Sequence, residues 1–132
     1  MVNPRKAYPI DPGLIPMFDR SGTSNLGHAL ETAVLLELDR RGADVSYVHT
    51  PAGLGVDFLA RHPSGAQELI QVCASLDDPT TRDREIRALV DAARHYPAAT
   101  LSLVALDIPA AIDIPPGIAL HHAADWMLEY AE

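Results

Sequence analysis

Apolar residues recur every four positions near the start of the chain, over residues 25–41. These residues are Leu26, Leu30, Val34 and Leu38. This spacing places them on one face of an α-helix. Ser24 or Asn25 can cap the first turn, and Gly42 stands where the residue after a helix end takes a positive φ. The pattern therefore predicts a helix over residues 25–41.

Three short segments with the character of β-strands follow this helix, at residues 45–49, 56–61 and 68–74. Turns rich in proline and glycine separate them. Links this short join antiparallel neighbours, because parallel strands need a long crossover between them. We therefore predict an antiparallel meander.

Asp78 and Pro79 predict the start of a second helix, as its cap and its first helical residue. Tyr96-Pro97 ends this helix, and its predicted buried side comprises Ile86, Leu89, Val90 and Ala93. A continuous apolar run over residues 100–106 indicates a central strand that is covered on both faces. The second helix is a crossover, so that this strand can lie parallel to an earlier one. Residues 117–120 and 123–131 predict a last strand and a closing helix.

These elements predict an α/β fold of order αβββαβ, with a mixed sheet flanked by helices. The chain has 132 residues, which suits one domain. Residues 1–23 are rich in proline and glycine, and we expect them to be a connector with an edge strand at residues 7–10. Residues 24–132 would form the domain.

The composition narrows the classes of function. The formal net charge is -8 and the pI is near 5.0, which counts against nucleic-acid binding by the domain alone because phosphate recognition needs a basic face. The one cysteine, Cys73, excludes an internal disulfide and a multi-cysteine zinc site. No signal peptide and no apolar run of about 20 residues is present. We expect a cytoplasmic protein without a membrane span.

Three motifs fall where an αβββαβ core would place an active site. They are Glu31 in the first helix, Gly-Val-Asp-Phe at 55–58 and Ile-Gln-Val-Cys at 70–73. They resemble the helix glutamate, the E-V-D-F and the I-E-V-K motifs of the PD-(D/E)XK nuclease superfamily. The resemblance implies a restriction-endonuclease-like core.

Further segments appear in the order seen in one large prokaryotic, archaeal-type family of AAA+ ATPases. These are Tyr-Pro-Ile-Asp-Pro-Gly-Leu at 8–14, Gly-His-Ala-Leu-Glu at 27–31 and Asp-Pro-Thr-Thr-Arg-Asp-Arg-Glu-Ile at 78–86. Nearly the whole chain resembles the C-terminal nuclease-like domain of that family. No Walker A loop is present in this chain. The resemblance therefore implies an ATPase partner, either upstream or on a separate chain.

In active members of the superfamily, the strand aspartate and the next acidic residue hold Mg²⁺ or Mn²⁺, and the lysine activates water. Here Gln71 and Cys73 replace the acid and the lysine. The resemblance thus implies a degenerate catalytic site at Glu31, Asp57, Gln71 and Cys73. If the site were partly functional, Asp57 and Gln71 would be the metal ligands. We expect no cofactor and a non-catalytic domain.

Two alternatives remain open. In the first, the chain is a metal-dependent DNA nuclease in which Arg61 or Arg84 substitutes for the lysine. In the second, it is a metal-free assembly module that forms homo-oligomers through a sheet edge or the C-terminal helix.

Each site residue also has a purely structural interpretation. Backbone donors would satisfy Asp57, His28 or Gln71 would hydrogen-bond Glu31, and Cys73 would be a small buried side chain. The arginines of the second helix would form a solvent-exposed face.

Overall fold

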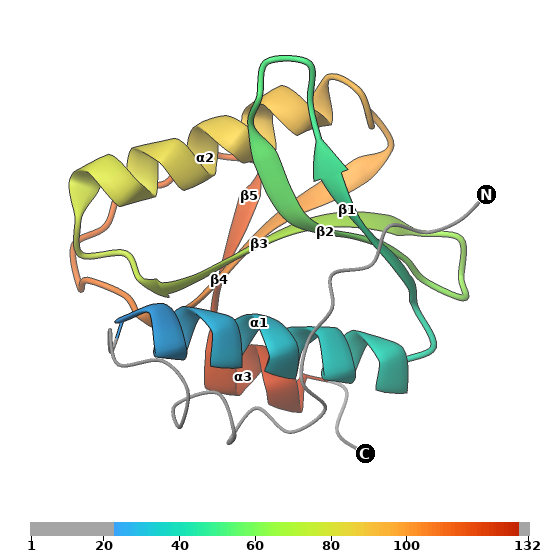
Figure 1. Cartoon of the computed structure of the whole chain (residues 1–132), viewed down its shortest axis with the longest axis horizontal. Coiled ribbons are helices and arrows are strands. Elements are labelled where there is room, and N and C mark those ends of the chain that lie inside the picture. The colour runs from blue at the N-terminus through green and yellow to red at the C-terminus, as the bar shows by residue number, and fades with distance from the viewer. Residues whose placement is uncertain (1–22, 130–132) are drawn as a thin grey trace.

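The computed structural model describes residues 23–129 and has an α/β fold (Figure 1). In chain order the elements are α1 (Thr23–Arg40), β1 (Asp44–His49), β2 (Gly55–Arg61), β3 (Gln67–Ser75), α2 (Pro79–Ala93), β4 (Ala99–Asp107), β5 (Ile118–His122) and α3 (Ala123–Leu128). This order confirms the predicted αβββαβ core followed by a strand and a helix. The predicted edge strand at residues 7–10 lies outside the described residues, as do residues 130–132.

The five strands form one mixed sheet in the order β1-β2-β3-β4-β5. β1, β2 and β3 are antiparallel neighbours, as the short turns predicted. β4 pairs parallel to β3, and β5 pairs parallel to β4. β4 can run parallel to β3 because α2 connects them. The helix crosses the sheet and brings the chain back to the end at which β3 begins.

Helices cover both faces of the sheet (Figure 1). On the face of α1 and α3, the buried side chains include Val34, Leu38, Phe58, Ile70, Val104 and Trp126. On the face of α2, they include Leu59, Leu69, Leu89, Ala92 and Leu103. Residues 102–105 of β4 are buried in succession, which confirms that both faces of this strand are covered.

The predicted cap of α2 and the positive φ of Gly42 are present. Ser24 and Asn25, predicted as caps, instead lie inside α1, and two predicted core positions are wrong. The Asp78 carboxylate accepts the Thr80 N–H at 3.1 Å, and Gly42 has a φ of 81°. Leu26 and Val90 are exposed rather than buried. On α2 the buried residues are Ala88, Leu89 and Ala92, because small alanines let the helix approach the sheet while Val90 points away.

The same α2 stripe includes position 85, which stands three and four residues before Ala88 and Leu89. A glutamate occupies it. Within residues 23–129, no helix combines the length and the apolar character needed to cross a bilayer.

Candidate functional site

Asp57 and Gln71 line one cavity of about 240 Å³ between β2, β3 and α2. Cys73, two residues after Gln71 on the same face of β3, lines a neighbouring cavity of about 530 Å³. Arg84 and Glu85 of α2 line both cavities. The structure therefore brings Asp57, Gln71 and Cys73 to one face of the sheet and places two α2 side chains over them.

Side-chain hydrogen bonds join β2 to β3 where the backbone ladder ends. The last paired residues of the ladder toward this end are Phe58 and Ile70. Beyond them, Asp57 N–H donates to Gln71 Oε1 at 2.8 Å, and Val72 N–H donates to Asp57 Oδ2, also at 2.8 Å. Gln71 Nε2 completes the link by donating to the Gly55 carbonyl at 3.1 Å. We call these three bonds the β2–β3 clamp.

The β2–β3 clamp uses the atoms that a metal site would need. Because a backbone N–H can only donate, its contact fixes which end of the Gln71 amide is the oxygen. That oxygen is the atom that would face a cation, and here it accepts the N–H of Asp57. The Gln71 side chain is only 3% exposed. Both predicted metal ligands thus contribute oxygens to strand pairing.

Glu85 carries an electrostatic cost at this site. Burial raises the pKa of the Glu85 carboxyl above its ordinary value, and the charge of Glu31 raises it further. The charge of Arg84 and a hydrogen bond with Gln71 act in the opposite direction. Glu31 therefore lies within electrostatic reach of Glu85, so that α1 and α2 direct two carboxylates toward the same end of the sheet.

Glu31 itself lies near His28, one of its predicted partners. Glu31 Oε2 is 3.9 Å from His28 Nδ1, with the histidine side chain on the outer surface of α1. This separation suits an ion pair rather than a hydrogen bond. Glu31 takes part in further interactions as well.

Cys73 has the properties of a protonated thiol. Burial raises the pKa of the thiol, and the charges of Glu85 and Asp57 add to the shift. The thiol donates to the Ser75 carbonyl with an S···O distance of 2.9 Å. A thiolate is the nucleophilic form of cysteine, so Cys73 supplies neither a nucleophile nor the ammonium group that a lysine would bring.

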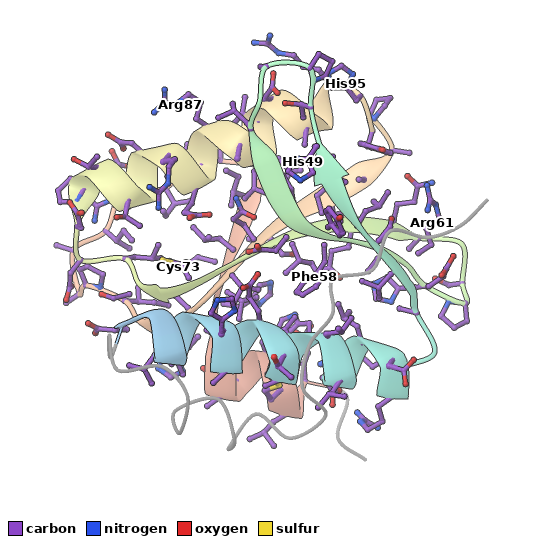
Figure 2. All side chains as sticks on the ribbon, in the orientation of Figure 1. His49, Phe58, Arg61, Cys73, Arg87 and His95 are labelled. Carbon is purple, nitrogen blue, oxygen red and sulfur yellow. The ribbon has the colours of Figure 1, made fainter. Side chains whose placement is uncertain are left out.

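Of the two arginines considered as substitutes for the lysine, only Arg84 lies at the site. Its Nη2 is 3.7 Å from Glu85 Oε1, and its side chain is 63% exposed. Arg61 is at the far end of β2, paired with Asp44 and Gln67. Figure 2 shows Arg61 at the opposite end of the sheet from Cys73.

The prediction of a solvent face for the arginines of α2 holds in part. Arg87 and Arg94 are exposed. Arg82 instead donates from Nη1 to the Leu76 carbonyl at 3.0 Å, which ties the first turn of α2 to the end of β3.

Sequence analysis did not identify Glu85 as a member of the site. The signal was present, because a glutamate on the buried stripe of a helix must meet other polar groups or be protonated. The pattern of Ile86, Leu89, Val90 and Ala93 placed that stripe one position away from the observed one. That pattern gave Glu85 no place on the buried side.

Asp57 and Gln71, the predicted ligands of Mg²⁺ or Mn²⁺, each use one oxygen in strand pairing. Such ions require several carboxylate or carbonyl oxygens directed at one point. Asp57 Oδ2 and Gln71 Oε1 accept backbone N–H groups, and burial raises the pKa of Glu85. In the described part of the chain, no group of three or more His, Cys, Asp or Glu side chains could hold a metal ion.

Comparisons of the chain with protein-family models, with curated proteins and with solved structures gave no match. The fold and the geometry of the site are therefore the basis for any statement about function.

Proposed function

We propose that this chain is a non-catalytic, nuclease-like accessory or interaction domain of a prokaryotic ATPase. It acts in the cytoplasm, and the ATPase lies upstream of it or on a separate chain. The β2–β3 clamp carries the proposal. In this interpretation, the aspartate and the following polar residue of a nuclease motif have become a structural link between two strands.

The missing lysine of the motif supports this proposal. Hydrolysis of a phosphodiester needs an activated water and a positive group over the transition state. The only lysine in the sequence is Lys6, which precedes the described residues. The position that follows the motif holds Cys73, a thiol whose pKa is raised.

The charge of the molecule gives independent support. A formal net charge of -8 repels a nucleic-acid backbone. The candidate site adds to this repulsion, because Asp57 and Glu85 line one cavity with Arg84, and Glu31 lies within electrostatic reach of Glu85. A protein partner suits this surface better than DNA does.

Incubation of the full chain with plasmid or oligonucleotide DNA and Mg²⁺ or Mn²⁺ tests the proposal. We expect no cleavage by the wild-type chain and no difference in the Asp57→Ala variant. Metal-dependent cleavage that Asp57→Ala abolishes would overturn it. A Walker A motif encoded upstream of Met1 or in an adjacent gene is the expected genetic context.

One observation favours a nuclease with a rearranged site as the second candidate. Arg84 lines the same cavity as Asp57 and Gln71, so that a guanidinium is available where the lysine is missing. Arg61 provides the matched control, because it lies at the other end of β2. DNA cleavage that is lost in Arg84→Ala but retained in Arg61→Ala would favour this candidate over the first.

A further inference from the structure

β5 forms an edge of the sheet that is open in the described part of the chain. It pairs with β4 along one side only. In a parallel ladder, every second residue turns its N–H and C=O away from the partner strand. Apart from the β4 ladder, the described backbone bond of this strand is a turn contact from Ile118 N–H to the Pro115 carbonyl. The outward groups of β5 are thus available for another strand.

The opposite edge differs. On β1, Asp44, Val45 and Tyr47 take part in further interactions. The ladder between β1 and β2 also contains a register shift between Ser46 and Val48, and such bulges protect edges from pairing. The β5 ladder has a continuous register from Ile118 to His122.

β5 also lacks the side chains that proteins use to block an edge. Charged residues, above all lysine, and proline are the usual protection. The strand reads Ile-Ala-Leu-His-His, without an acidic residue, a lysine, an arginine or a proline. Its alternation places Ile118 and Leu120 against the core on the α2 side, whereas Ala119 and His121 point to the other face.

We propose that β5 pairs antiparallel with β5 of a second copy of this chain, about a two-fold axis at Leu120. Ala119 then lies opposite His121 of the second copy, and Ile118 lies opposite His122 of the second copy. This register is possible whichever residues of β5 direct their N–H and C=O outward. An antiparallel pair of strands can be centred on a hydrogen-bonded or on a non-hydrogen-bonded residue pair. Two five-stranded sheets become one continuous sheet.

Charge permits a second copy at this edge. Two chains that each carry -8 repel one another, and this repulsion is weakest where the facing strands have no acidic side chain, as on β5. α3 follows it directly and presents Ala124 and Leu128 on one helical face, with Leu128 68% exposed. These side chains add apolar area beside the strand. A pair of five-residue edges is small against the roughly 1,600 Å² of a standard interface, so the dimer should be weak and concentration-dependent.

Light scattering or sedimentation of the full chain, from micromolar to near-millimolar concentration, tests the proposal. The wild-type chain should shift from monomer to dimer mass. The double variant Ala119→Lys/His121→Lys directs two pairs of ammonium groups at each other across the axis, which destabilises strand pairing. Its dimer dissociation constant should rise by at least about tenfold.

The matched control is His95→Lys/Ala98→Lys. His95 and Ala98 are exposed beyond the end of α2, and this variant makes the same two residue changes with the same change of net charge. It should dimerise within about twofold of the wild-type chain. Since both variants lower the net negative charge, a general charge effect would strengthen association in both.

Wild-type chain that stays monomeric at all concentrations would overturn the proposal. Equal dimerisation of the two double variants would do the same. If the β5 variant fails to fold by circular dichroism, hydrogen exchange of the wild-type chain decides. The β5 amides should exchange more slowly at high than at low protein concentration, and exchange that is independent of concentration contradicts the dimer. This proposal is independent of the proposed function, because DNA cleavage by a dimer would sink only the latter.

Discussion

At the residue scale, Gln71 joins two strands through its side-chain amide. Its amide holds Asp57 N–H and the Gly55 carbonyl at the point where β2 and β3 separate. Gln71→Leu keeps the size of the side chain but leaves these two groups without that partner. Because unpaired buried polar groups are costly, we expect a loss of about 2–4 kcal/mol in the free energy of unfolding, measured by urea denaturation.

Gln67 on the same strand and the same face is the control for this substitution. Its side chain is half-buried and lies at the far end of β3 from the clamp. Gln67→Leu should change the free energy of unfolding by less than about 0.5 kcal/mol. Equal effects of the two substitutions would show that the clamp contributes no specific stability.

The second residue-scale prediction concerns Glu85 and pH. Its pKa in the folded protein is raised above the ordinary 4.5, first by burial. Between these two pKa values the folded state binds more protons than the unfolded state, so that stability falls as pH rises through this window. Below the ordinary pKa both states are protonated, and the penalty disappears.

Glu85→Gln removes this carboxyl while it keeps the shape and a hydrogen-bonding end. The variant should gain stability relative to the wild-type chain as pH rises from about 4 to about 8, measured by thermal unfolding at each pH. Asp83→Gln, on the exposed side of the same helix, is the control and should show no such trend. A constant difference between wild type and Glu85→Gln across this range would mean that Glu85 is not held at a raised pKa.

At the scale of elements, one arginine joins the end of α1 to α3. Arg41 Nε donates to Glu37 at 2.7 Å, and Arg41 Nη2 donates to the Trp126 carbonyl at 2.6 Å. The guanidinium also lies 4.2 Å from the centre of the Trp126 ring, where a cation–π interaction contributes. The Arg41 side chain is 7% exposed, so this junction is part of the core.

Glu37 gives this junction a pH dependence of the opposite sign. Hydrogen bonds from Arg40 and then Arg41 lower its pKa to about 2 from 4.5, against the effect of burial. A lowered pKa contributes stability that is complete above the ordinary value and is lost as pH falls toward 2. Glu37→Gln should therefore cost about 1–2 kcal/mol at neutral pH, after allowance for screening by solvent, and little near the lower value.

Arg40 separates the contribution of the surface from that of the junction. Its side chain is 56% exposed and donates to Glu37, whereas the contacts with Trp126 come from Arg41. Arg40→Gln should cost little stability because solvent screens an exposed ion pair, whereas Arg41→Gln should cost more because it also removes the contacts with Trp126. Urea denaturation of the two variants at neutral pH compares them directly.

Sequence patterns predicted the elements well because each has a local cause. The four-residue repeat of α1, the Asp78-Pro79 start of α2 and Gly42 each act within a few residues, and the structure has them where expected. The buried face of α2 was harder to predict. Val90 is more apolar than Ala88, yet the close approach of the helix to the sheet selects the smaller residue.

The shared face of Asp57, Gln71 and Cys73 was predictable from the sequence, whereas their hydrogen bonds were not. The alternation of β3 already put Gln71 and Cys73 on one face, and the strand order brought Asp57 beside them. That Gln71 bonds backbone groups of β2 depends on where the two strands diverge, which no local pattern specifies. Glu85 enters only through the packing of α2 over the sheet, which also brings Arg84 to the site.

At the scale of the whole molecule, the clamp predicts how the fold responds to metal ions. A ligand that binds only the folded state at a hundredfold excess over its Kd adds about 2.7 kcal/mol of stability. That corresponds to several degrees in Tm for a domain of this size. Since Asp57 Oδ2 and Gln71 Oε1 already accept backbone N–H groups, a cation would compete with the β2–β3 link for these oxygens. We therefore expect the same Tm in EDTA, in millimolar Mg²⁺ and in millimolar Mn²⁺.

The Asp57→Asn variant keeps an oxygen that can accept the Val72 N–H and serves as the control. A rise of several degrees with either metal in the wild-type chain, absent from Asp57→Asn, would mean that the link opens to hold an ion and that the site retains the first requirement of a nuclease.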